Sequence, residues 1–138
     1  MSFDPYLFFS GNCREAMTRY QEIFGGDLVL LPNSEAPEGQ GMPGASPDSI
    51  MHGALTVNGR LLMASDDPTG NNGPKVGAAV SHAAADEGEA KRIFDALSDG
   101  GEVQMPLGQT FFSPAFGACV DRFGVSWMVM VWSEGPQG

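Results

Sequence analysis

The chain is 138 residues long, and 42% of its residues are hydrophobic while 17% are charged. This composition is typical of a globular domain and excludes a disordered segment. Seventeen acidic residues against seven basic ones give a formal net charge of −10. Because nucleic-acid phosphates and anionic lipids repel such a polyanion, we expect no nucleic acid and no membrane as a partner.

The amino-terminal segment and the cysteine count bear on location. Met1–Pro5 lacks the basic and apolar stretches of a signal peptide, and no apolar run in the chain is long enough to span a bilayer. Cys13 and Cys119 are too few for a disulfide scaffold. We therefore expect a cytoplasmic protein.

The first half of the chain predicts one helix among four strands. After a strand at 5–10, Asn12 and Glu15 form a variant of the capping box, and apolar residues then recur at helical spacing until Gly25-Gly26. Three further apolar runs predict strands at 27–31, 49–57 and 60–65. The turn Asn58-Gly59 is a type I′ hairpin signal between the last two strands.

The second half repeats this order. A strand at 76–84 precedes a helix that begins with Asp86 as its cap and Glu89 three residues later, and that ends at Gly100-Gly101. Three more apolar runs predict strands at 102–107, 115–121 and 124–132. The polar and apolar positions of the first helical segment recur in the second at one constant distance along the sequence, as Asn12 and Asp86 do. This match indicates an internal duplication.

We therefore predict a single domain of the α+β class made of two tandem β-α-β-β-β modules, at 1–66 and 76–138, joined by a linker at 67–75. One helix covers only one face of a four-stranded sheet. The other face must be buried by the second module, by another chain or by a ligand. Two antiparallel mixed sheets of this kind form a concave cleft suited to a small molecule. The sequence leaves open whether one chain or two complete that cleft.

Paired modules of this type resemble the vicinal oxygen chelate superfamily of glyoxalase, bleomycin-resistance and dioxygenase proteins, and the residues resemble its PhnB-like branch. The resemblance spans nearly the whole chain, and its main motifs are Pro5-Tyr6-Leu7-Phe8-Phe9, Leu62-Met63-Ala64-Ser65-Asp66 and Asp121-Arg122-Phe123-Gly124-Val125-Ser126-Trp127-Met128. Some members carry a 3-demethylubiquinone methyltransferase-like label. No glycine-rich nucleotide loop supports it, because Gly39–Gly44 neither follows a strand nor opens a helix.

The resemblance also implies a divalent metal held at four strand positions by His, Glu or Gln. In this chain the resemblance puts those positions on Tyr6 or its neighbour, on Leu62 or Met63, on Ala79 within one residue, and on Met128. None of these side chains is a good ligand for a divalent cation. We therefore predict no metal and no other cofactor.

Six residues are the expected pocket lining: Tyr6, His52, Met63, Phe111, Phe112 and Met128. His52 is the only catalytic candidate, because it could donate or accept a hydrogen bond with a ligand or act as a general base. The alternative interpretation is that His52 is a half-buried strand residue with a structural role. Phe111 and Phe112 cover either the pocket or a partner subunit. His82 is expected to be structural, and the scattered acidic residues are expected on the solvated surface.

Cys13 stands at the start of the first predicted helix. The helix dipole there lowers a thiol pKa, which makes a reactive thiolate one hypothesis. The residue also belongs to the apolar stripe of the helix, so a small core residue is the favoured interpretation.

The resemblance implies a PhnB-like small-molecule binding protein without the superfamily metal site, assembled as a homodimer. The alternative is a metal-dependent lyase, isomerase or dioxygenase of the same superfamily with displaced ligands, or one that uses His52 as a base without metal. A purely structural interaction module is a third hypothesis. The sequence does not identify the ligand or substrate.

Overall fold

The computed structural model describes residues 3–37, 39, 45–67 and 75–131. The chain divides into two compact units, Met1–Asn72 and Gly73–Gly138, here called unit 1 and unit 2. Most of the predicted linker and of the Gly39–Gly44 motif lies outside the described residues. Within the described residues, no helix has the length and apolar character needed to cross a membrane.

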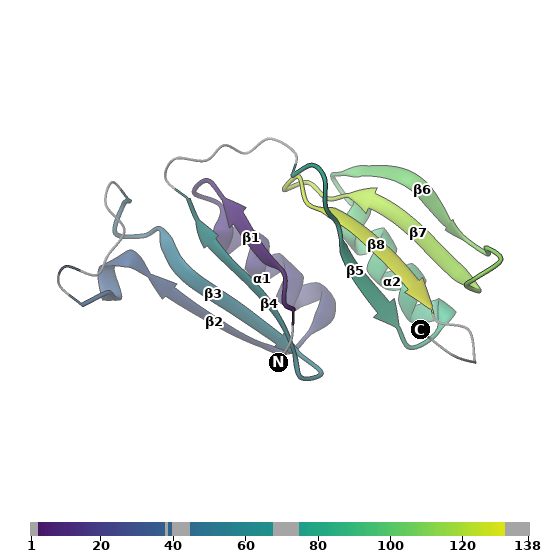
Figure 1. The fold of residues 1–138 in the computed structure, drawn as a ribbon, viewed down its shortest axis with the longest axis horizontal. Coiled ribbons are helices and arrows are strands. Elements are labelled where there is room, and N and C mark those ends of the chain that lie inside the picture. Colours follow the sequence, from purple (N-terminus) through teal and green to yellow (C-terminus); the bar gives the residue numbers. More distant parts are fainter. Residues whose placement is uncertain (1–2, 38, 40–44, 68–74, 132–138) are drawn as a thin grey trace. The chain divides into compact units, whose positions relative to one another are not determined.

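Unit 1 contains one helix and a four-stranded sheet (Figure 1). Its elements are β1 (Tyr6–Phe9), α1 (Cys13–Phe24), β2 (Asp27–Pro32), a 3-10 turn (Asn33–Glu35), β3 (Ile50–Val57) and β4 (Arg60–Asp66). The strand order is β1-β4-β3-β2, with β1 parallel to β4 and the other pairs antiparallel. Asn58 and Gly59 have φ values of 50° and 78°, so the predicted hairpin turn is confirmed.

Unit 2 repeats this topology. Its elements are β5 (Val80–Ala84), α2 (Glu87–Ser98), β6 (Glu102–Gly108), β7 (Ala115–Val120) and β8 (Ser126–Val131). The strand order is β5-β8-β7-β6, and β5 runs parallel to β8. The predicted α+β fold of two tandem modules is therefore confirmed, with a mixed sheet in each module.

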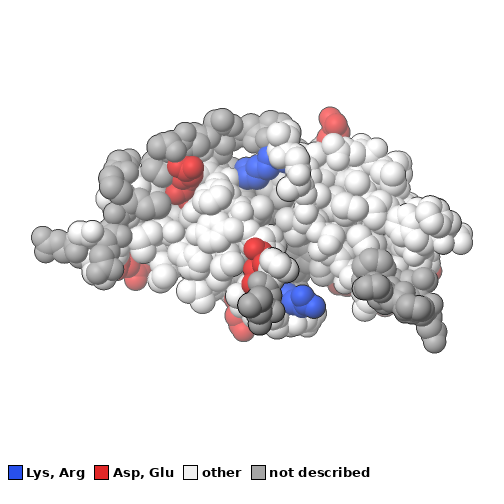
Figure 2. Space-filling model, in the orientation of Figure 1, with Lys and Arg blue, Asp and Glu red and all other residues white. Residues whose placement is uncertain are grey.

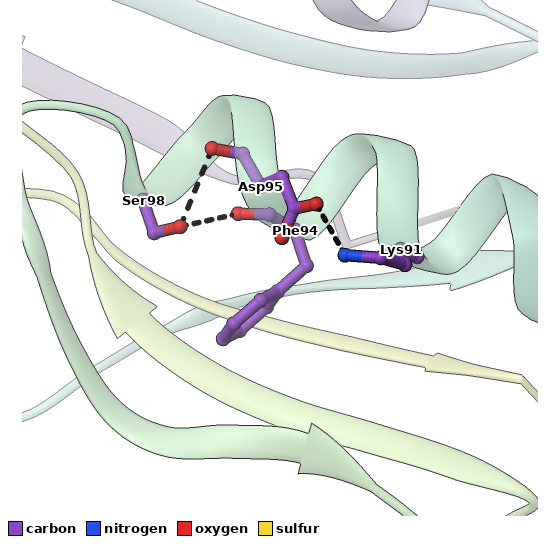
Figure 3. Close-up of polar contacts among 4 residues, drawn as sticks. All are labelled: Lys91, Phe94, Asp95 and Ser98. Atoms are coloured by element: carbon purple, nitrogen blue, oxygen red, sulfur yellow. Dashed lines mark hydrogen bonds and ion pairs between the residues drawn. The ribbon is translucent and has the colours of Figure 1, made fainter.

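Each helix packs on one face of its own sheet, and Figure 1 shows both helices behind the strands. In unit 2, Figure 3 shows the Phe94 ring pointing from α2 toward the strands, where Phe94 is buried. On the solvent side, Lys91 Nζ lies 2.7 Å from a carboxylate oxygen of Asp95. The Ser98 hydroxyl donates to the Phe94 carbonyl at 2.7 Å, which satisfies one of the carbonyls near the end of the helix. The apolar side of α2 that the sequence predicts therefore forms part of the core of unit 2.

The two helices begin differently. The Asp86 side chain accepts a hydrogen bond from the Glu89 backbone N–H at 2.8 Å, as the sequence predicts. The expected cap by Asn12 is wrong, because its side chain makes no capping hydrogen bond. Asp66 takes that place, and its carboxylate accepts from the backbone N–H of Cys13, the first helical residue, at 3.0 Å.

Candidate functional site on unit 1

The side of the unit 1 sheet opposite α1 is here called the open face. Residues paired in register across the strands point to the same side of a sheet. Tyr6, Met63, Ala54 and Val29 form one such row, from β1 through β4 and β3 to β2. By this register, the open face carries eleven residues of the four strands: Tyr6, Phe8, Asp27, Val29, Leu31, His52, Ala54, Thr56, Leu61, Met63 and Ser65.

Much of the apolar surface on this face is accessible. Phe8 is 56% exposed and Val29 is 55% exposed, although both stand in the middle of regular strands. Figure 2 views this side of unit 1 and shows mostly uncharged surface over the strands. A sheet face with large, accessible and uncharged side chains is a candidate for covering by another molecule.

A hydrogen bond joins two of the predicted site residues across this face. The Tyr6 hydroxyl oxygen lies 3.2 Å from Nδ1 of His52, although β4 separates their two strands in the sheet. The Tyr6 ring is also 5.2 Å from the Phe8 ring and 5.8 Å from the His52 ring, centroid to centroid. The structure thus brings Tyr6, His52 and Met63 together. It adds Phe8, which the sequence placed on the uncovered sheet face but not among the six expected lining residues.

The strand register also locates the positions at which the superfamily resemblance implies metal ligands. Tyr6 pairs with Met63 between β1 and β4, and Ser81 pairs with Met128 between β5 and β8. If Met128 corresponds to Met63, Ser81 corresponds to Tyr6 in unit 2. The resemblance gave Ala79 within one residue for this position, and β5 begins at Val80, inside that range.

This donor set does not fit a divalent metal. A phenol, an aliphatic hydroxyl and two thioethers lack the imidazole, carboxylate or thiolate groups that hold such ions. Within the described part of the chain, no three His, Cys, Asp or Glu side chains are grouped so that they would hold a metal.

The aromatic loop between β6 and β7 packs on its own sheet. Phe111 is fully exposed, and Phe112 is 41% exposed. The Phe112 ring meets the ring of buried Phe116 edge-to-face, with centroids 5.1 Å apart. Phe116 pairs with Met130, on the same side of the sheet as half-buried Met128. Phe112 thus covers part of the unit 2 sheet, a role that the sequence analysis did not consider.

Two carboxylates that the sequence placed on the solvated surface are buried. Asp66 accepts backbone N–H bonds from Gly11, Cys13 and Ile50 at 2.8 to 3.0 Å. Asp121 accepts from the backbone N–H of two residues in the β7–β8 turn and from the indole N–H of Trp127 at 2.9 Å. Both Asp residues lie in segments that carry the family resemblance, and this was the one sign in the sequence that they have a structural role.

The two thiols are buried and unreactive. Burial, and to a smaller extent the neighbouring Asp66 carboxylate, raises the pKa of Cys13 to about 12. Burial likewise raises the pKa of Cys119 to about 11, with Asp121 adding to the effect. Because the thiolate is the reactive form, the reactive-thiolate hypothesis for Cys13 is wrong and the core interpretation holds.

His82 lies on the helix side of the unit 2 sheet. Burial lowers its pKa, the nearby Glu89 carboxylate opposes that shift, and the Arg92 guanidinium adds to it. His82 therefore belongs to the packing between β5 and α2, and His52 is the histidine of the open face.

Comparison with known proteins identifies the family. The profile of the family described as 3-demethylubiquinone-9 3-methyltransferase matches residues 1–130. The chain is 31% identical to Protein YjdN of Escherichia coli (strain K12), over 99% of each chain.

Solved structures agree with this match. Protein PA1353 from Pseudomonas aeruginosa has a TM-score of 0.86 and 44% identity, covering 96% of this chain and 98% of that one. The PhnB protein from Bacillus cereus has a TM-score of 0.75 and 27% identity, covering 95% and 99%. A glyoxalase/bleomycin resistance/dioxygenase domain from a Frankia species, 12% identical over 99% of this chain and 95% of that one, shares the fold with a TM-score of 0.67. The chain therefore belongs to the family described as 3-demethylubiquinone-9 3-methyltransferase, a description that the PhnB protein from Bacillus cereus also carries, and it shares the fold of a glyoxalase/bleomycin resistance/dioxygenase domain.

Proposed function

We propose that this chain is a small-molecule binding protein whose binding surface is the open face of unit 1, and that it works without the superfamily metal site. The observation that carries the proposal is the Tyr6–His52 hydrogen bond within a half-exposed apolar surface. Sites for small molecules combine such surfaces with a few placed polar groups.

The energetics favour an apolar ligand. Each Å² of apolar surface removed from water contributes about 25 cal/mol. Phe8 and Val29 keep more than half of their surface accessible, so a ligand that covers them gains free energy without any rearrangement of the sheet.

Binding rather than metal-assisted catalysis is also what the donor set supports. By the resemblance, the strand positions that the superfamily uses for its metal correspond to Tyr6, Met63, Ser81 and Met128, which are paired across their strands. A sequestering role of the bleomycin-resistance type needs contacts alone and no activated water. We expect a homodimer, and the cytoplasmic location stays a prediction from the sequence.

The experiment is an NMR titration of the ¹⁵N-labelled full chain with indane, an uncharged bicyclic hydrocarbon. We expect amide shifts on the strands of the open face and a several-fold weaker affinity in Val29→Ala. Val103→Ala is the matched control, since Val103 is 46% exposed on unit 2. Absence of shifts in wild type, or equal affinities in both variants, would contradict the proposal.

Elemental analysis of the isolated protein tests the alternative enzyme. About one Mn, Fe, Ni or Zn per chain would favour a metal-dependent lyase, isomerase or dioxygenase. A turnover, including the methyl transfer named in the family description, that His52→Ala abolishes would favour a catalytic base on the open face.

A further inference from the structure

We infer that Tyr6 holds His52 in the tautomer that presents its Nε2–H to the ligand, so that the open face selects ring-bearing apolar molecules with a neutral carbonyl oxygen. The inference rests on the proposed function, because it names the ligand class of the same surface. In it, His52 is a specificity-determining residue and Tyr6 is a positioning residue.

The tautomer follows from the chemistry of the two partners. A neutral imidazole carries one N–H donor and one bare nitrogen that accepts. The Tyr6 hydroxyl, 3.2 Å from Nδ1, is a good donor and a weak acceptor, whereas a bare imidazole nitrogen is a strong acceptor. The phenol therefore donates to Nδ1, and the imidazole proton resides on Nε2.

Among the residues that the structure describes, none provides an acceptor for the Nε2–H. The Tyr6 hydroxyl is the hydrogen-bond partner that the described residues supply to the His52 ring, and it occupies Nδ1. Leu31, directly opposite His52 on β2, offers only an apolar side chain. A ligand that covers this face without an acceptor oxygen leaves a desolvated donor without a partner, which weakens binding. A ligand that carries such an oxygen avoids this cost.

The surroundings distinguish a neutral oxygen from an anionic one. The open face as defined contains no Lys or Arg, and the chain carries a net charge of −10. A carboxylate moved onto this apolar surface loses hydration that one neutral N–H does not replace. The tilted Tyr6 and Phe8 rings add flat apolar surface against which a ring packs. A ring with a ketone, aldehyde, ester or quinone oxygen fits all of these features.

The first test reads the tautomer directly. Long-range ¹H–¹⁵N correlation spectra distinguish the protonated from the bare ring nitrogen, and the chain has two histidines, so His82 serves as an internal reference. We expect a bare Nδ1 and a protonated Nε2 in His52, and a mixture of both tautomers in Tyr6→Phe. A protonated Nδ1 in the wild type would overturn the inference, whatever the face binds.

The second test uses three probes of one shape: indane, 1-indanone and indane-1-carboxylate. We expect 1-indanone to bind roughly 3- to 10-fold more tightly than indane, as one hydrogen bond predicts, and indane-1-carboxylate to bind most weakly. His52→Leu should remove the preference for the ketone, and His52→Gln, which keeps an N–H donor, should restore part of it.

The outcomes separate the two claims. Equal binding of indane and 1-indanone, or tighter binding of the carboxylate, overturns the carbonyl preference and leaves the proposed function standing. If none of the probes shifts the resonances of the open face at millimolar concentration, the proposed function fails and the inference fails with it.

Discussion

The two units share one topology but use a buried carboxylate differently. Asp66 joins three segments, since it ends β4 and its oxygens bind the stretch that leads into α1 and the start of β3. Asp121 works locally, closing the β7–β8 turn and fixing the Trp127 indole a few residues away. A repeated fold therefore does not require repeated polar contacts, and each module has its own means of ordering its loops.

The faces opposite the helices differ as well. In unit 2, Phe116 and Met130 are buried, and Phe112 from the β6–β7 loop packs on Phe116. In unit 1, Tyr6 and Phe8 remain accessible, and the Tyr6 hydroxyl lies within hydrogen-bond distance of the His52 ring. We therefore propose that the ligand binds the accessible face of unit 1, and not the unit 2 face that Phe112 covers.

The largest expected loss of stability comes from removing the two buried carboxylates, which tests the comparison between them. Asp66→Ala leaves three backbone N–H groups, two before and at the start of α1 and one at the start of β3, without their acceptor. We expect a loss of about 4 kcal/mol in the free energy of unfolding. Asp121→Ala leaves two turn N–H groups and one indole N–H, and we expect about 3 kcal/mol. Urea unfolding followed by circular dichroism measures both.

The control for these variants is Glu22→Ala, at an exposed position on α1. We expect it to change the free energy of unfolding by less than about 0.5 kcal/mol. If Asp66→Ala behaves like this control, the carboxylate does not hold the three segments together.

A loss similar to that of Asp121→Ala is expected where a helix leads into the next strand. A Cβ on Gly26 would lie 2.2 Å from the Thr56 carbonyl oxygen, and a Cβ on Gly101 would lie 2.1 Å from the Val120 carbonyl oxygen. We expect Gly26→Ala and Gly101→Ala each to cost about 3 kcal/mol by thermal or urea unfolding, because the backbone must shift.

Gly25→Ala is the matched control for Gly26→Ala. Both glycines have positive φ, but a Cβ on Gly25 meets no atom within 4 Å. We expect about 1 kcal/mol from the backbone strain alone. Equal losses in the two variants would show that close packing against β3 is not what selects glycine at position 26.

These contacts mark what was readable from the sequence and what was not. The helices, the strands and the turn at Asn58-Gly59 follow local periodicity, and they were predicted. The cap of α1 was missed because its acceptor, Asp66, is 53 residues away from Cys13 in sequence. Tyr6 and His52 were both predicted as lining, but their hydrogen bond spans 46 residues and depends on the strand register.

The two buried thiols predict a pH dependence that both units share. Burial raises the pKa of Cys13 from 9.0 to about 12, so the folded protein retains a proton that the unfolded chain releases. The thiol therefore stabilises the fold fully below pH 9, and this contribution is lost as the pH rises from 9 toward 12. For Cys119 the loss runs from 9 toward about 11.

Unfolding free energies at pH 8 and pH 10.5 measure this effect. We expect the wild type to lose more stability between these pH values than Cys13→Ala or Cys119→Ala, and the double variant to lose least. Identical losses in all four proteins would mean that the thiols ionise as readily in the folded state as in the unfolded one.

The smallest effect tests whether unit 2 covers its own sheet. Phe112→Ala removes the edge-to-face contact with Phe116, and we expect a loss of about 1 kcal/mol in unfolding free energy. Phe111→Ala is the control, because Phe111 is fully exposed and touches Phe112 at its ring edge. We expect it to cost less than half as much in a monomeric state.

The unfolding free energies of both variants should be measured at several protein concentrations, because this separates packing within one chain from contact with a partner subunit. A partner subunit that covers Phe111 would make the Phe111→Ala loss grow with concentration, since association stabilises the folded chain by mass action. A loss in Phe112→Ala that is independent of concentration belongs to the loop and sheet of one chain. If instead both losses rise together with concentration, the loop is a subunit contact, and the contrast between a self-covered unit 2 and an accessible unit 1 no longer holds.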